Sequence, residues 1–328
     1  MLSVCAGIKE YLQQKNLASD EISALIEYCI NSYNKDAVFL NANYLLKLNG
    51  ISSVGDIALE QILVLAEEMF SYQDLKFTVW VGHVLRFLKA EYENICKYEL
   101  YRKINEKYAG VMCLYGVISG LEGLIRLYEA KNIPYEYLKA SLGDVAIWIK
   151  DAGRRGIIGL QNDAWIVFTM KFKIFRIGRL QFEPCVFNFS ALSYQGHETL
   201  TERDMPALFV HVPEDGKLMG IEESMLKAEE FFKLYFPETT FQTFFCQSWL
   251  LDENLQKFLG EDSNIKKFKQ MFNLLPGKGN SDAVNRVFGD ADVDLKSFVP
   301  VTSLQKDLKK YFSDGNKVFD RFGYKLIE

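Results

Sequence analysis

The sequence has few of the features that mark disordered, metal-binding or membrane-spanning chains. Only seven of its 328 residues are proline and 49% are hydrophobic, which excludes a disordered or low-complexity protein. The six cysteines show no CxxC spacing, so the short signatures of structural zinc and thioredoxin-type redox sites are missing, and we expect no metal site. No run of 18 uncharged apolar residues occurs, so we expect no membrane-spanning helix.

Positive charge is also scarce. The formal net charge is -5 at pH 7, which argues against a general binder of nucleic acid or anionic membranes, because such binding depends on an excess of Lys and Arg. The first residues, Met1 to Leu12, already carry Lys9 and Glu10 and do not resemble a secretory signal. We therefore expect a cytoplasmic protein whose partners include neither nucleic acid nor a membrane.

Helical periodicity dominates the first half of the chain. From Ser3 to about Ala152 apolar residues recur at helical spacing, as in Ile22, Leu25 and Cys29. A chain of this length favours two domains. We expect an all-helical N-terminal domain over residues 1–117.

The pattern changes after Gly178, where apolar and polar residues alternate as in a strand. Two later apolar runs, Ala207–Val212 and Phe241–Leu251, flank an amphipathic helix from Ile221, and this order predicts a parallel crossover. The fold class is then α+β (mixed α/β): the helical domain plus a second domain over 118–328, with leading helices at 118–176 and a mixed central sheet.

Several segments resemble one known family. They are Gly178-Arg179-Leu180-Gln181-Phe182-Glu183, His211-Val212-Pro213, Cys246-Gln247-Ser248-Trp249 and Thr302-Ser303-Leu304-Gln305. In this order and spacing they resemble bacterial acyltransferase-domain proteins with a helical N-terminal domain and a C-terminal domain like GNAT (Gcn5-related N-acetyltransferase). The resemblance implies an acyl-CoA-dependent N-acyltransferase, with acetyl-CoA or another acyl-CoA as co-substrate and a small-molecule or peptide amine as acceptor. The alternative is a catalytically silent GNAT-like ligand-binding or interaction protein.

The resemblance also implies a cofactor site. Ala207–Val212 and Phe241–Trp249 are similar to two parallel GNAT strands that splay apart, which assigns the backbone of Val210 and Val212 to the pantetheine arm. The helix N-terminus after them offers N–H groups to the pyrophosphate, and we expect these at Gly216, Lys217, Gly220 and Ile221. This stretch departs from the usual superfamily motif. Carboxylates surround it, which disfavours phosphate: Glu214, Asp215, Glu222 and Glu223. Glu222 and Glu223 equally serve as the normal complement to a helix dipole.

Three residues are candidates for catalysis. His211 ends the first of these two strands, where many GNAT enzymes present a base, and an imidazole exchanges protons near neutral pH. The alternative is a histidine that serves only structure in a turn. Glu214 is a second candidate for the base, and Ser248 is placed to touch a substrate. Cys246 is better explained as a core residue.

Other polar residues have two interpretations or none. Arg179 and Gln181 either line the acceptor cleft, or Arg179 pairs with Glu183 on the same sheet face. We expect His197 and Gly277-Lys278-Gly279 in loops. The usual leaving-group acid of the superfamily is a tyrosine after the second parallel strand, but no tyrosine occurs between Tyr235 and Tyr311, so that role is unassigned.

Overall fold

The computed structural model describes residues 2–51, 56–92, 94–187, 205–279, 281–289 and 292–327. Its contacts divide the chain into two compact units, Met1–Phe175 and Arg176–Glu328. We expected the second domain to begin near residue 118, with its own leading helices. In the structure those helices pack on other helices of the first unit, α9 on α3 and α8, and α10 on α7 and α8. The boundary between the two compact units therefore lies between Phe175 and Arg176, later in the chain than the expected boundary near residue 118.

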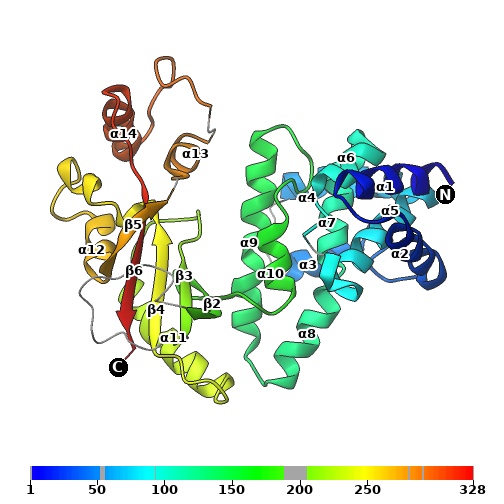
Figure 1. Cartoon of the computed structure of the whole chain (residues 1–328), viewed down its shortest axis with the longest axis horizontal. Helices are drawn as coiled ribbons and strands as arrows, with labels where there is room; N and C mark the ends of the chain where they lie inside the picture. The colour runs from blue at the N-terminus through cyan, green and yellow to red at the C-terminus, as the bar shows by residue number, and fades with distance from the viewer. Residues whose placement is uncertain are drawn as a thin grey trace. The chain divides into compact units, whose positions relative to one another are not determined.

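Up to residue 174, the regular elements of the described residues are all helices, joined by turns and loops (Figure 1). Its α-helices are α1 (Leu2–Gln14), α2 (Ser19–Ser32), α3 (Tyr44–Ile51), α4 (Asp56–Phe70), α5 (Gln73–His83), α6 (Tyr98–Ile104), α7 (Ala109–Ile118), α8 (Leu121–Ala130), α9 (Tyr135–Arg154) and α10 (Ala164–Met170). The helical spacing seen in the sequence corresponds to one buried face. In α2 that face carries Ile22, Leu25, Ile26 and Cys29. The expectation of an all-helical first part is confirmed.

The α7 helix is the centre of this unit, and all ten of its residues are buried. It lies within Glu106–Ala130, a stretch that has the length and composition to cross a membrane. Our expectation that no such segment exists was wrong. In this structure 83% of the most apolar window is buried inside the protein, as in the core helix of a folded domain.

A buried ion pair holds part of this core together. Arg86 follows α5 in a π-helical turn, Val84–Leu88, and its side chain is fully buried. Its guanidinium donates to the Asp163 carboxylate, to the Tyr101 hydroxyl oxygen at 2.5 Å and to the Cys96 carbonyl oxygen at 3.2 Å. A Cβ on Gly82 would lie 1.9 Å from the Tyr101 oxygen, so a glycine is required there. The network joins segments that are far apart in the sequence.

We expect Asp163→Ala to lower the free energy of unfolding by about 3–5 kcal/mol, because it leaves the Arg86 charge buried without its carboxylate. The double variant Arg86→Met with Asp163→Leu should be more stable than Asp163→Ala alone, since it removes both charges. Urea unfolding measures the free energy of unfolding of both variants. A loss below about 1 kcal/mol in Asp163→Ala would contradict a role for this pair in holding the core.

His83, at the end of α5, lies among aromatic rings. Its ring centroid is 4.8 Å from Phe39, 5.4 Å from Trp80 and 5.6 Å from Phe87, and Nδ1 is 2.9 Å from the Ser119 hydroxyl oxygen. Burial lowers the pKa of His83 to about 4. The protein therefore holds this imidazole neutral at a pH where a free histidine is charged.

Since unfolding restores the ordinary pKa, the unfolded chain binds more protons than the folded chain between about pH 6.5 and pH 4. We expect the wild type to lose stability over this range as pH falls, by at most about 3 kcal/mol from this group. His83→Phe removes the titration and leaves the Ser119 hydroxyl its bond to the Gly116 carbonyl oxygen. Chemical unfolding at several pH values should show that the free energy of unfolding of the wild type falls relative to that of the variant as pH decreases. If the two proteins show the same pH dependence, His83 is not the origin of the loss.

The second unit is built on a six-stranded sheet of order β1-β2-β3-β4-β6-β5 (Figure 1). Its strands are β1 (Phe175–Ile177), β2 (Leu180–Phe187), β3 (Met205–His211), β4 (Thr243–Ser248), β5 (Asn273–Gly279) and β6 (Asp320–Leu326). β3 and β4 are parallel, whereas β2 with β3, β4 with β6 and β5 with β6 are antiparallel. The expected α+β class and mixed sheet are confirmed. Gly277-Lys278-Gly279 belongs to β5, so the expectation of a loop there was wrong.

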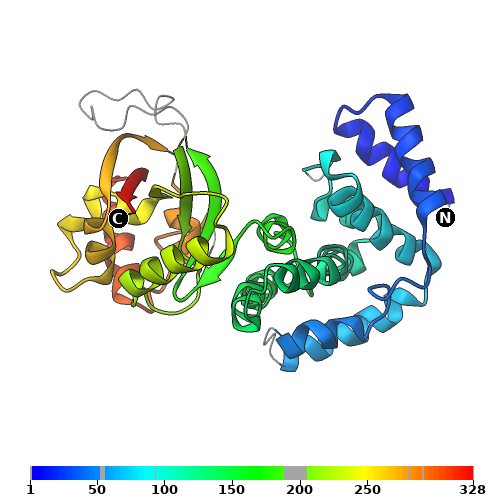
Figure 2. The ribbon, with the colours of Figure 1, turned by 90° about the horizontal axis from the view of Figure 1, so that it is seen from below.

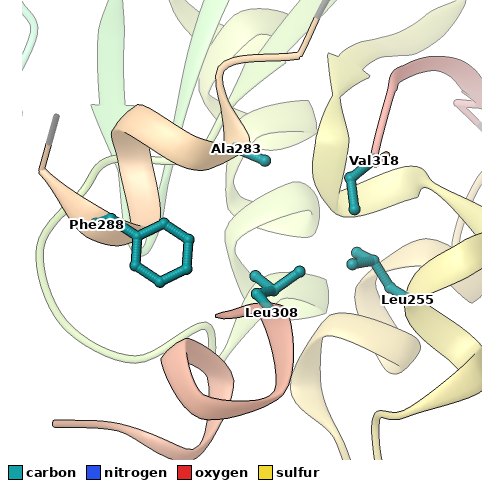
Figure 3. Close-up of a cluster of buried hydrophobic side chains, with 5 residues drawn as sticks. All are labelled: Leu255, Ala283, Phe288, Leu308 and Val318. Carbon is teal, nitrogen blue, oxygen red and sulfur yellow. The ribbon is translucent and has the colours of Figure 1, made fainter. Parts of the chain in front are cut away.

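Helices surround this sheet (Figures 1 and 2). They are α11 (Ile221–Tyr235), α12 (Asn264–Gln270), α13 (Ala283–Phe288) and α14 (Ser303–Ser313). The α11 helix forms the crossover between the parallel strands and packs against β2. An apolar cluster, drawn in Figure 3, packs Ala283 and Phe288 of α13 and Leu308 of α14 against Leu255 and Val318. This cluster fixes α13, which bears Arg286.

Candidate functional site

The parallel strands β3 and β4 pair over only part of their length. Their register runs from Ala207 with Thr243 to Phe209 with Phe245 and ends there. Both strands continue: β3 stays paired with β2 as far as His211, and β4 stays paired with β6 as far as Ser248. Beyond Phe209 and Phe245 each strand therefore follows its other neighbour, and the two edges separate. Backbone donors and acceptors on those edges are open to pair with a ligand's amides.

His211 stands at the mouth of this opening beside a carboxylate. Its Nε2 lies 3.1 Å from Oε2 of Glu183, and its ring centroid lies 4.2 Å from that of Phe209. Glu183 is opposite Phe209 in the β2–β3 register, so it is the diagonal neighbour of His211 on one sheet face. Both side chains are partly exposed. The structure thus gives His211 the partner that the sequence did not show.

This pairing fixes what His211 can do chemically. A carboxylate accepts and does not donate, so it favours the tautomer whose Nε2 carries the proton. The lone pair is then on Nδ1, and the same carboxylate stabilises the imidazolium that forms when Nδ1 takes up a proton. A histidine held in this way is suited to general base catalysis.

Gln181 lies opposite His211 in the β2–β3 register and is almost fully buried.

Arg179 does not pair with Glu183, which was one of the two interpretations. It belongs to the turn before β2, and its guanidinium lies 3.3 Å from the Asp215 carboxylate. The sequence alone indicates no role for Glu183 at the site beyond a pairing with Arg179. Its contact with His211 depends on a β2–β3 pairing across more than 20 residues, which no local pattern reveals.

Glu214, the second candidate for the base, has a different partner. Its carboxylate is 3.5 Å from the guanidinium of Arg286 on α13. Asp215 pairs with Arg176 at 2.9 Å and with Arg179. Two carboxylates that disfavoured a phosphate at this loop are therefore balanced by arginines from other elements.

The loop between β3 and α11 leads directly into the helix N-terminus. Gly216 and Gly220 have φ of +65° and +69°, a region that glycine adopts without strain. Ile221 begins α11, and Gly220 precedes it without a side-chain cap, so the first N–H groups of the helix receive no capping oxygen from that position. Glu223 pairs with Lys227 along the helix at 2.6 Å. Gly216, Lys217, Gly220 and Ile221 thus form a loop and helix start with the geometry that anion binding uses.

Ser248 is not brought together with His211. Successive strand residues point to opposite faces, and Gln247 shares the face of Phe245, Phe209 and His211, which leaves Ser248 on the other face. Its hydroxyl oxygen accepts from the backbone N–H of Leu250 at 3.2 Å and caps the 3-10 turn Trp249–Leu251. A structural role accounts for this hydroxyl. Burial raises the pKa of Cys246 well above the ordinary thiol range, as expected for a core cysteine.

Aromatic rings extend from His211 across the same sheet face. Phe209 lies 5.1 Å from Phe245, which stacks on Phe187 at 4.0 Å between ring centroids. Phe187 and Phe209 are half-buried and belong to an apolar cluster built on Met205, Phe245, Leu275 and Tyr324. The wall beside the catalytic candidate is therefore apolar. His197, expected in a loop, lies outside the described residues.

Comparison with known proteins agrees with this geometry. No curated protein matches the sequence. The family model of the GNAT-like C-terminal domain matches residues 174–325. A solved acyltransferase in complex with decanoyl-CoA and teicoplanin is 22% identical, with a TM-score of 0.71 over 88% of each chain. An acyltransferase mutant in complex with octanoyl-CoA is 20% identical, with a TM-score of 0.72 over 98% of this chain and 99% of that one.

At these identities the likeness to solved structures is one of fold, and it extends over both units. The splayed parallel pair, the crossover helix and the mixed sheet all fall within the matched residues. After its helical unit in the sequence, the chain therefore carries a GNAT-like C-terminal domain at residues 174–325.

Proposed function

We propose that this protein transfers an acyl group from an acyl-CoA to an amine. The observation that carries the proposal is the end of the β3–β4 pairing at Phe209 and Phe245, with the His211–Glu183 pair at the mouth of the opening. Support comes from the GNAT-like family match and from neighbours of the same fold that were crystallised with decanoyl-CoA, octanoyl-CoA and CoA.

In this proposal the separated strand edges bind the pantetheine arm through the backbone near Val210 and Val212. The pyrophosphate lies at the loop and helix start formed by Gly216, Lys217, Gly220 and Ile221, where backbone N–H groups and the helix dipole favour negative charge. The thioester carbon is then near the mouth of the opening.

His211 acts as the base. The amine nitrogen forms a bond to the thioester carbon, the carbon–sulfur bond breaks, and CoA leaves as a thiolate. The proton lost by the amine goes to Nδ1 of His211, and Glu183 holds the ring and stabilises its charged form. Glu214 is the alternative base, but its contact with Arg286 favours a structural role.

The aromatic wall favours an acyl chain longer than acetyl. Each buried methylene contributes about 0.8 kcal/mol when it leaves water. Phe187, Phe209 and Phe245 offer such a surface on the His211 side of the sheet. We propose medium-chain acyl-CoA as the donor and a small-molecule or peptide amine as the acceptor; one neighbour of this fold was crystallised with teicoplanin.

Thermal denaturation with CoA, acetyl-CoA, octanoyl-CoA and decanoyl-CoA tests the proposal most directly. A ligand that binds the native state raises the melting temperature by mass action. We expect a shift with CoA and larger shifts with the octanoyl and decanoyl thioesters than with acetyl-CoA. No shift with any of the four at millimolar concentration would favour the alternative, a catalytically silent GNAT-like module.

We expect His211→Ala to lower turnover by about 10²- to 10⁴-fold, the range for general bases, while affinity for acyl-CoA stays near that of the wild type. Glu183→Gln should reduce turnover less, because it removes the charge opposite the imidazolium and keeps the side-chain shape. CoA thiol released from decanoyl-CoA in the presence of teicoplanin measures turnover, and calorimetry measures affinity. Full activity of a folded His211→Ala protein would transfer the assignment to Glu214.

A further inference from the structure

Arg179 lies in the turn between β1 and β2, and this turn is fixed to the crossover helix. Its backbone N–H donates to the Ser224 hydroxyl oxygen on α11 at 2.6 Å. Gly178 precedes it with φ of +63°, and a Cβ at Gly178 would lie 2.5 Å from the same oxygen. Ser224 is almost fully buried. The base of the Arg179 side chain is therefore held against the first turns of α11.

From this position the guanidinium binds the loop that leads into α11. Nε donates to the Lys217 carbonyl oxygen at 2.8 Å, and Nη2 donates to the carbonyl oxygens of Pro213 at 2.8 Å and Gly216 at 3.4 Å. Nη1 lies 3.3 Å from the Asp215 carboxylate. One planar group thus gathers three carbonyls and one carboxylate of a single loop.

These contacts set the direction of the loop's N–H groups. In a trans peptide unit the N–H points opposite to the C=O of the preceding residue. Because the carbonyls of Gly216 and Lys217 point toward Arg179, the N–H groups of Lys217 and Leu218 point away from it. Arg179 therefore turns the acceptors of this loop inward and its donors to the opposite side, as a loop that binds an anion requires.

We propose that Arg179 is a positioning residue that holds the loop of residues 213–220 in its anion-binding conformation and thereby determines affinity for the nucleotide part of acyl-CoA. The inference rests on the proposed function. It assigns to Arg179 an effect on acyl-CoA affinity that acts through the conformation of the 213–220 loop. A guanidinium is suited to this task, because its donors lie in one plane with fixed directions. A lysine ammonium is a compact charge without that geometry.

Two ligands separate this role from general stability. Decanoyl-CoA carries the pyrophosphate, whereas S-decanoyl-pantetheine carries the same acyl chain and amides without it. In Arg179→Ala we expect the Kd for decanoyl-CoA to rise about 10- to 100-fold, which corresponds to the loss of one or two charge-assisted hydrogen bonds. The Kd for S-decanoyl-pantetheine should change less than about 3-fold.

Arg179→Lys and Arg176→Ala are the matched controls. If the guanidinium geometry matters, Arg179→Lys keeps the charge and still binds decanoyl-CoA nearly as weakly as Arg179→Ala. Arg176→Ala removes the other arginine that pairs with Asp215 and leaves the carbonyl contacts of Arg179, so we expect a smaller loss. Wild-type affinity in Arg179→Lys would overturn the proposal, because charge alone would then suffice. Equal losses for both ligands in Arg179→Ala would also overturn it.

Hydrogen–deuterium exchange without ligand provides a second measurement. In Arg179→Lys we expect faster exchange in peptides that cover 213–220, with the β3 and α11 peptides unchanged. Ser224→Ala, which only loosens the turn, should show the same pattern more weakly. If Arg179→Ala does not fold, these two variants decide the question, and unchanged loop exchange in both contradicts the proposal. If the wild type binds neither ligand, the proposed function itself is refuted. If wild type and Arg179→Ala bind decanoyl-CoA with equal affinity, only the role of Arg179 is refuted.

Discussion

The central constraint of the second unit is that two parallel strands are each paired over a greater length with an outer neighbour than with each other. β3 follows β2 to His211 and β4 follows β6 to Ser248, while their own register ends at Phe209 and Phe245. A sheet normally satisfies its backbone groups internally. Here the antiparallel pairs on both sides hold the edges apart, so the opening is a property of the whole sheet. It places backbone groups, the base candidate and the helix start within one continuous stretch of structure.

Electrostatics at the loop before α11 depend on the tertiary fold. In the sequence, carboxylates surround the proposed phosphate site, and only Lys217 offsets them. In the structure, arginines from β1, from the β1–β2 turn and from α13 approach Asp215 and Glu214. The cluster drawn in Figure 3 belongs to this balance, because it packs the helix that bears Arg286. Carboxylates paired with arginines repel an incoming phosphate less than exposed ones do, so an acidic loop and an anion site are compatible.

Sequence reasoning could predict what depends on local periodicity. The helical first half, the crossover from β3 through α11 to β4 and the mixed sheet follow from spacings of 3.6 and 2 residues. Contacts between distant segments could not be predicted in the same way. Glu183 meets His211 only because β2 and β3 pair in one particular register, and Ser248 proves to cap a turn that follows its own strand. The Glu106–Ala130 stretch illustrates the same limit, since composition alone does not distinguish a core helix from a membrane span.

The carboxylates of Glu214 and Glu183 show why position in a fold outweighs nearness in sequence. Glu214 is three residues from His211, but a residue from α13 pairs with it. Glu183 is far away in the chain and lies 3.1 Å from the imidazole. A strand pair fixes Glu183 relative to His211 through backbone hydrogen bonds, whereas Glu214 belongs to a loop whose shape is determined by Arg179. In the proposed function the sheet supplies the rigid part of the site, where proton transfer requires fixed geometry, and the loop supplies backbone donors for a flexible nucleotide. The same chain separates the two tasks by assigning them to different kinds of structure.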